Sequence, residues 1–238
     1  MGNVVTLTRR ELQATFFSPI AYVVGAGYLL LSGYFFLHDV LVPGNEASMR
    51  PLFDNMARLL VFAIPLLTMR SLSEELSTGT METLMTAPVT DAQVILGKFA
   101  GIMIFYVVLL VTTLVHAGLL LHYAEMPWQA VAMGYVGLLL LGAAFTAVGL
   151  FASTLTRYQI LAALIGAGLL SALTFMMDYL GEVGGDAWRA ITSGMNLLGH
   201  FDDFSKGIFD TRALVILLSA AVFFLFLAVK VLESRRWR

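Results

Sequence analysis

The stretch FAGIMIFYVVLLVTTLVHAGLLL, residues Phe99–Leu121, contains no Asp, Glu, Lys or Arg. A helix needs about 20 mostly apolar residues to cross a bilayer, and this run is long enough. Four further runs are similarly apolar: Ile20–Leu37, Ala130–Ala152, Ile160–Met177 and Ala213–Val231. Only 13% of the 238 residues are charged and 59% are hydrophobic, whereas soluble domains carry about a quarter of charged residues. The chain is therefore predicted to be an all-α, polytopic membrane protein.

A sixth run, Leu52–Met69, is weaker as a span because polar residues interrupt its outer half. We include it because Leu59–Met69 is uninterrupted and a membrane helix tolerates a proline such as Pro65. With both termini placed in the cytoplasm, nine of the 14 basic residues lie inside and five outside, which is the positive-inside bias. The alternative, a short re-entrant segment, would put the termini on opposite sides.

The six predicted transmembrane helices form a single transmembrane domain over residues 1–238. Three segments outside them carry further information: 3–17, 78–88 and 178–212. The spans are expected at about residues 20–37, 52–76, 94–121, 129–153, 159–178 and 213–232.

Residues Asn3–Phe17 are predicted to form a short amphipathic helix before the first span. Thr8 and Glu11 have the spacing of a capping box. Arg9 and Arg10 are placed to reach lipid phosphates from its polar side. A Ser-Pro pair then breaks the helix and gives an elbow. The alternative is an ordinary cytoplasmic extension of the first span.

The loop Arg70–Lys98 joins the second and third spans on the cytoplasmic side. The second helix is expected to continue through Leu76 and to stop at Gly79. A short amphipathic helix follows and ends at a proline. Thr90 and Gln93 then have capping-box spacing and start the third long helix. A short helix held between two spans is suited to dock in a groove of another protein and to transmit its motion.

Two signals lie within the spans. Asp54 and Arg58 are four residues apart on one helix face near the outer surface, so they are expected to pair. The pair either lines a polar vestibule or snorkels to the interface, and the sequence does not separate these alternatives. Gly97 and Gly101 form a G-x-x-x-G pattern, which favours close packing of helices.

The predicted outer segment Asp178–Arg212 is long but rich in apolar residues, which a solvated loop would not keep. We predict two short amphipathic helices there that lie in the outer leaflet or dip back into it.

Several chemistries are excluded by the absence of their motifs. The sequence has no phosphate-binding G-x-x-x-x-G-K-[ST] loop, no H-E-x-x-H zinc motif and no G-x-S-x-G nucleophile motif. It has no cysteine, and its net charge of -2 argues against nucleic acid as a partner. A haem-binding redox subunit remains an alternative through His116, although the other histidines, His38, His122 and His200, fall at the outer interface rather than at a matching depth.

The loop sequence also resembles a known family. Its pattern Glu74-Glu75-x-x-x-Gly79-Thr80-x-Glu82-x-Leu84, followed by Pro88 and by Leu-Gly-Lys at 96–98, is similar to the cytoplasmic loop of ABC-2-type transporter permeases. The nearest branch is the gliding-motility (Gld-type) permeases. Further matches are spread over nearly the whole chain: Arg10-Glu11, Ser18-Pro19-Ile20, Ala147–Ser153 with Gln159, and Phe201–Arg212.

The resemblance implies an amphipathic elbow helix, a cytoplasmic coupling helix and outer re-entrant helices before the last span. It implies two copies of a separate ATPase subunit, which bind the ATP and Mg, so that this chain is not an enzyme and holds no cofactor. It also implies a second membrane subunit, identical or related, and a bacterial cytoplasmic (inner) membrane with its lipids; an outer domain would come from a partner protein. The residues that match the coupling motif are Glu74, Glu75, Gly79, Thr80, Glu82, Leu84 and Pro88.

These observations predict the permease subunit of an ATP-driven exporter. The alternative is a membrane anchor or scaffold whose ATPase partner performs mechanical work on an outer protein.

Overall fold

The computed structural model describes residues 2–42, 48–80, 89–123, 127–183, 185, 192 and 194–235. The described residues form helices and no strand. Six of the helices are long and apolar enough to cross a membrane: Pro19–Val40, Arg50–Thr78, Asp91–Tyr123, Trp128–Leu155, Gln159–Gly181 and Thr211–Arg235. The prediction of an all-α chain with six such helices is confirmed.

The helices follow one another in the order of the predicted segments, with small shifts at their ends. They are α1 (Gly2–Phe16), α2 (Pro19–Phe35), the π-helical η1 (Phe36–Val40), α3 (Arg50–Thr68), α4 (Ser73–Thr78), α6 (Asp91–Tyr123), α7 (Trp128–Leu155), α8 (Gln159–Ser171), the π-helical η2 (Ala172–Met176), α9 (Met177–Val183), α11 (Leu197–Ser205) and α12 (Thr211–Arg235).

The core of the bundle lies around the second and fourth spans. Of their apolar windows, 56% and 72% are buried, against 28%, 28% and 17% for the first, fifth and sixth spans. The less buried helices expose large apolar side chains such as Leu30 on α2, Ile160 on α8 and Phe223 on α12. These faces are suited to contact lipid tails or another membrane subunit.

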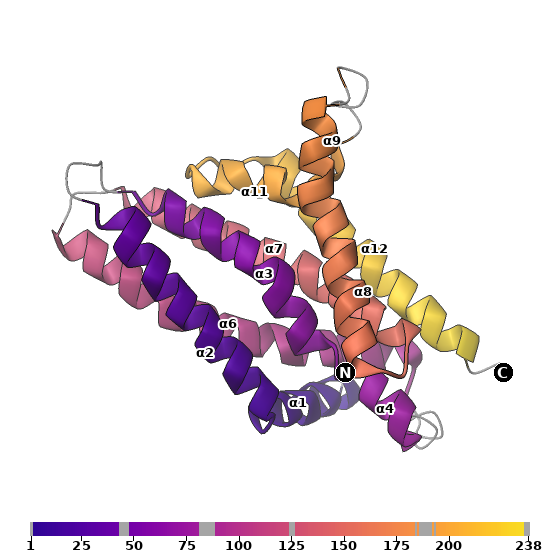
Figure 1. Ribbon diagram of the computed structural model, residues 1–238. Coiled ribbons are helices and arrows are strands. Elements are labelled where there is room, and N and C mark those ends of the chain that lie inside the picture. The colour runs from indigo at the N-terminus through magenta and orange to yellow at the C-terminus, as the bar shows by residue number, and fades with distance from the viewer. Residues whose placement is uncertain are drawn as a thin grey trace.

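Both termini and α4 lie at one end of the bundle (Figure 1). The helices α9 and α11 lie at the opposite end, where α11 runs across the long helices (Figure 1). An even number of crossings requires this arrangement of the termini. We call the end with α4 the inner end and the end with α11 the outer end.

Two expectations for the first helices are wrong. α1 begins at Gly2, so Thr8 lies inside the helix, where its hydroxyl donates to the Val4 carbonyl at 2.9 Å and caps nothing. The second span, Arg50–Thr78, does pass Leu76, but not as the continuous helix that was expected, because α3 ends at Thr68 and α4 begins at Ser73. The predicted start of the third span is confirmed: the Gln93 amide donates to Thr90 Oγ1 at 3.3 Å, and the Thr90 amide donates to Gln93 Oε1 at 3.2 Å.

The first and fifth spans each change to π-helix near the outer end, over η1 and η2. In η1 the Leu41 amide donates to the Phe36 carbonyl, five residues back, at 3.1 Å. Asp39 in η1 accepts a hydrogen bond from Asn55 Nδ2 at 2.7 Å. Asp178, just after η2, accepts one from Asn196 Nδ2 at 3.1 Å.

The short helix α11 closes the outer end of the bundle with an apolar face. Phe201 and Phe204 on this face are buried against α7, where a Cβ added at Gly137 would lie 2.5 Å from Phe204 Cβ. α11 is thus an amphipathic helix within the predicted segment 178–212, and its apolar residues turn toward the bundle. The other helix predicted there falls mostly outside the described residues.

Candidate functional site

The chain bends between α3 and α4 because a serine of α7 interrupts the helical ladder. Ser153 Oγ accepts the amides of Leu72 and Ser73 at 3.0 and 3.1 Å and lies 3.3 Å from the Met69 carbonyl. The first amides of a helix have no partner within it, so this buried hydroxyl caps α4 from a neighbouring helix. α4 is therefore fixed to the inner end of α7.

The far end of α4 is set by glycine. Gly79 has a φ of +73° and follows the last helical residue, Thr78. A left-handed backbone of this kind favours glycine, because it has no Cβ. The prediction that Gly79 stops this helix is confirmed. Glu74 and Glu75 lie in the first turn of α4, where the helix dipole favours negative charge.

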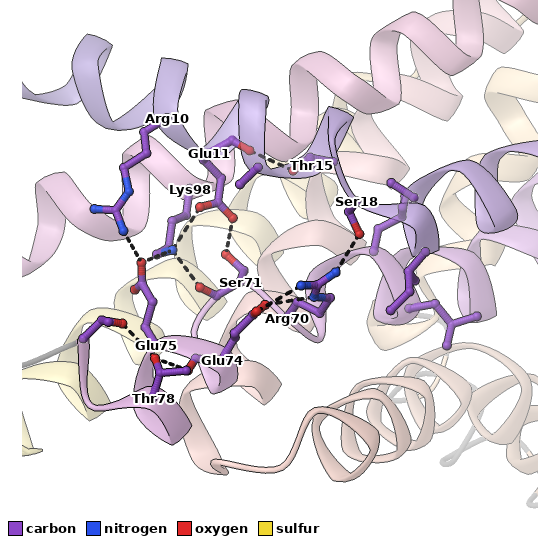
Figure 2. A pocket seen from close by; sticks show the side chains of 16 residues that line it. Arg10, Glu11, Thr15, Ser18, Arg70, Ser71, Glu74, Glu75, Thr78 and Lys98 are labelled. Carbon is purple, nitrogen blue, oxygen red and sulfur yellow. Dashed lines mark hydrogen bonds and ion pairs between the residues drawn. The ribbon is translucent and has the colours of Figure 1, made fainter.

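Lys98 of α6 is buried and joins three segments of the inner end. Its Nζ donates to the Ser71 carbonyl at 2.7 Å and to Glu11 Oε2 at 3.0 Å, and it lies 3.1 Å from Glu75 Oε1. The ammonium group has three donors; here it donates two hydrogen bonds and forms an ion pair with Glu75. Figure 2 shows the Lys98 side chain between Glu11 of α1 and Glu75 of α4.

The two carboxylates around Lys98 have further partners. Ser71 Oγ donates to Glu11 Oε1 at 2.8 Å, and Arg10 Nη2 donates to Glu75 Oε1 at 3.4 Å (Figure 2). Two basic and two acidic side chains therefore balance in charge. The second oxygen of Glu75, Oε2, is buried with no hydrogen-bond partner among the described residues. We call Arg10, Glu11, Ser71, Glu75 and Lys98 the inner network.

α1 packs directly on α6, and two glycines of α6 make this possible. A Cβ added at Gly97 would lie 2.6 Å from Leu7 Cβ, and one added at Gly101 would lie 2.8 Å from Glu11 Cβ. Both distances are shorter than van der Waals contact. The G-x-x-x-G pattern therefore does serve close helix packing, and its partner is the amphipathic helix α1.

A second connection links the bend to the start of the first span. Arg70 binds Glu74 through two hydrogen bonds, at 2.9 and 3.0 Å, and its Nη1 donates to Ser18 Oγ at 2.8 Å. Between this connection and the inner network lies a cavity of about 330 Å³ (Figure 2). Ile20 and Leu66 line its apolar side.

The predicted coupling residues fall partly within this region. Glu74 and Glu75 belong to α4, and Gly79 and Thr80 follow it, with Thr80 Oγ1 at 2.9 Å from Thr78 Oγ1. The other predicted residues, Glu82, Leu84 and Pro88, lie outside the described residues.

Sequence reasoning did not predict the contacts of Glu11, Ser71, Lys98 or Ser153; it assigned Glu11 to a capping box and used Lys98 and Ser153 in the family resemblance. One signal was available for Lys98. It is the eighth residue of the long helix that starts at Asp91, and apolar residues such as Leu96 and Phe99 lie close to it in the sequence; a buried lysine requires acceptors.

At the outer end, Asp54 and Arg58 line the same cavity, of about 540 Å³, together with Asp178, Asn196 and Asp202. The ion pair of Asp54 is with Arg50, at 3.9 Å between Oδ2 and Nε. Among the described residues, no ion pair within 4.0 Å joins Asp54 to Arg58, whose side chain is exposed. The two possible partners lie four residues on either side of Asp54, so spacing alone did not choose between them.

His116 lies within the third span and packs inside the bundle. Its Nδ1 lies 3.1 Å from the Thr113 carbonyl, and its ring centroid lies 4.9 Å from that of Phe36. Within the part of the chain that the structure describes, no three His, Asp or Glu side chains are grouped to hold a metal ion.

A sequence model for the family described as "ABC-2 family transporter protein" matches residues 15–198. The match runs from the end of α1 to the start of α11 and so covers more than three quarters of the 238 residues. No curated protein matches the chain.

Proposed function

The chain belongs to the ABC-2 transporter family, a family of membrane permease subunits of ABC transporters, and we propose that it couples ATP hydrolysis by a separate ATPase subunit to the export of a substrate. The loop between the second and third spans would be the part that the ATPase grips. The ATPase would supply the nucleotide site and its Mg, because this sequence has no phosphate-binding loop.

The observation that carries this proposal is the position of α4. It begins the loop that follows the second span, and it is bonded to α1, α6 and α7 rather than only to its own chain neighbours. A displacement of α4 would therefore reach three other helices. A loop without such connections would bend and would not transmit the motion to the other helices.

The charges of this segment suit a basic partner surface. Glu74 has a side chain that is 40% exposed, and Glu82 follows in the sequence eight residues later. Electrostatic complementarity of this kind sets the register and the specificity of a docked helix. We propose that Glu74 and Glu82 face basic residues of the ATPase, that Glu75, whose side chain is 14% exposed and pairs with Lys98, orients α4 from its inner side, and that Gly79, Thr80, Leu84 and Pro88 shape the docked segment.

The remaining parts of the proposal concern assembly and orientation. Two ATPase copies would bind two membrane subunits, identical or related. The membrane subunits would meet through the exposed apolar faces of the less buried helices of the bundle. The inner end would face the cytoplasm of a bacterium, because the basic residues concentrate there. The loop motif favours the gliding-motility type of permease, in which an outer partner protein would supply any outer domain.

The direct test is a charge reversal in the proposed docking segment. The chain is purified with the phosphate-loop ATPase that accompanies it and is reconstituted in liposomes. Glu82→Lys should leave membrane insertion unchanged but should reduce ATPase co-purification and substrate-stimulated ATP hydrolysis.

The matched control is Glu233→Lys. Glu233 is a half-exposed acid near the inner end of α12 and pairs with Lys230 at 2.7 Å, but it lies outside the loop. This variant should retain ATPase binding and transport. Unchanged binding, hydrolysis and transport in Glu82→Lys would contradict the proposal, and a wild-type chain that binds no ATPase would exclude it. Labelling of single cysteines in the cysteine-free chain would test which side the inner end faces.

A further inference from the structure

Lys98 is unusual because burying a lysine between helices is energetically less favourable than burying an apolar side chain. Transfer of an ammonium group from water to a protein interior is strongly unfavourable unless acceptors surround it. Replacing a buried ion pair with apolar residues of similar size is often neutral or stabilising. Stability alone therefore does not account for Lys98, whereas a need for fixed geometry does.

Three acceptors fix the position of the Lys98 ammonium group, and they come from three different segments. Glu11 belongs to α1, the Ser71 carbonyl to the bend, and Glu75 to α4; each lies 2.7 to 3.1 Å from Nζ. Protein N–H···O hydrogen bonds have donor–acceptor distances of about 2.7–3.2 Å and depend strongly on their angle. Sliding any one segment by about an ångström would therefore break a contact to a buried charge.

The backbone helix is interrupted between α3 and α4, whereas the side-chain contacts of Lys98 link α4 directly to α1 and α6. The amides of Leu72 and Ser73 bond to Ser153 instead of continuing the ladder of α3. On the other side, α1 cannot slide along α6, because Gly101 leaves room for Glu11 only at close contact. The hydroxyl of Ser71 also holds Glu11, at 2.8 Å.

We infer that Lys98 is a positioning residue that makes α1, α4 and the start of α6 move as one body. In this arrangement α1 is not only a helix at the membrane surface: it also moves when α4 is displaced. The bend at residues 69–72 separates this body from α3. The mechanical role of this body in transport rests on the proposed function, whereas its rigidity can be measured on the chain alone.

The test of rigidity uses the lack of cysteine in the chain. Gln13 on α1 and Ser77 on α4 are exposed and outside the inner network, so both are changed to cysteine and carry spin labels. Pulsed electron resonance then gives the distribution of distances between them in the full chain. Native Lys98 should give one narrow distribution, and Lys98→Met should broaden it or add a second distance.

A matched variant separates positioning from stability. In the triple variant Lys98→Met, Glu11→Gln, Glu75→Gln, no buried carboxylate is left without its counter-ion, so the fold should recover. The distance distribution should nevertheless stay broad, because the charged contacts are gone. A narrow distribution in the folded triple variant would overturn the inference. If that variant fails to fold, Glu75→Gln alone is measured, and a narrow distribution there would overturn it equally.

The same variants distinguish this inference from the proposed function. With the ATPase present, the triple variant should bind the ATPase as the native chain does, while transport per ATP hydrolysed falls roughly tenfold, the scale of a typical coupling between sites. Failure of the native chain to bind any ATPase would refute the proposed function and leave the measured rigidity unaffected. Normal transport in a triple variant with a broad distribution would refute the mechanical role of Lys98.

Discussion

The inner and outer ends of the bundle both hold helices together with ion pairs, but they do so in different surroundings. At the inner end the side chains of Lys98 and Glu11 are 7% and 14% exposed. At the outer end Arg50 and Asp202, which are 2.8 Å apart, are 46% and 39% exposed. Water screens and competes with the exposed outer pair more strongly than with the largely buried inner pair.

Different forces therefore fix the two ends. α11 is held mainly by Phe201 and Phe204, which are buried against α7, and its ion pairs add little. α4 has a smaller apolar anchor, because among its six residues Leu76 alone is apolar and is only partly buried against the core, so the helix depends more on directed polar contacts. Apolar packing tolerates small shifts, while a buried charge does not. The inner end is thus the part of the molecule whose geometry is most strictly specified.

The largest expected difference between the ends comes from removing one lysine at each. Lys98→Met leaves Glu11 buried without its counter-ion and Glu75 with Arg10 alone, and it should lower the free energy of unfolding by about 3–5 kcal/mol. Lys206→Met removes a half-exposed partner of Asp202 and Asp203 and should cost less than about 1 kcal/mol. Denaturant unfolding in detergent measures both. Equal losses would show that the two ends do not differ in this way.

A smaller effect is expected from the contact between α1 and α6. Gly101→Ala places a methyl group 2.8 Å from Glu11 Cβ and 3.2 Å from the Leu12 amide, so it should cost about 1–3 kcal/mol. The control is Gly118→Ala in the same helix, where nothing lies within 4 Å; it should be neutral or slightly stabilising. A thermal unfolding series of the two variants checks this. Equal midpoints would mean that α1 is not packed as described.

The cap of α11 is the outer counterpart of the Ser153 cap at the inner end. Asn196 Oδ1 accepts the Gly199 amide at 3.1 Å, and its Nδ2 donates to Asp178. Asn196→Ala should lower stability by about 1 kcal/mol and should release α11 locally, which faster hydrogen exchange of residues 199–203 would report. Asn196→Ser keeps a side-chain acceptor for the cap without placing a second carboxylate beside Asp178, and it should preserve most of the cap. Unchanged exchange in Asn196→Ala would assign the position of α11 to its phenylalanines alone.

The smallest effect concerns the pH dependence of the outer pair. Burial acts to raise the pKa of Asp202, but hydrogen bonds from Lys206 and Arg50 outweigh it and hold that pKa below its ordinary value. A carboxylate whose pKa falls on folding stabilises the protein above its unfolded value of about 3.9 and loses this contribution as the pH falls through the folded value. Native protein should therefore lose more stability than Asp202→Asn between about pH 5 and pH 3. Parallel curves would show that Asp202 contributes nothing.

What the sequence predicted correctly depends on signals within one segment. Apolar length located the six spans, Gly79 marked the end of α4, and Thr90 with Gln93 marked the start of α6. Each of these features is decided by residues a few positions apart, so a single sequence contains enough information.

What the sequence did not predict depends on contacts between distant segments. Glu11 and Lys98 are 87 residues apart, and Ser153 reaches Leu72 across 81. No spacing rule links such positions, so Glu11 was assigned to a capping box and the second span was expected to continue through Leu76. The first error arose because α1 begins at Gly2, six residues before Thr8. The second arose because Ser153 accepts the amides of Leu72 and Ser73, a tertiary contact that no local pattern encodes.

The two π-helical segments also set which way the outer ends of their spans face. One additional residue in a helical turn rotates everything beyond it by about 100°. Without η1 and η2, Asp39 and Asp178 would point away from the asparagines that they bind. The first and fifth helices, far apart in the chain, thus use the same extra residue to aim an exposed carboxylate at an asparagine of a neighbouring segment, and deleting one residue from either segment would break that contact.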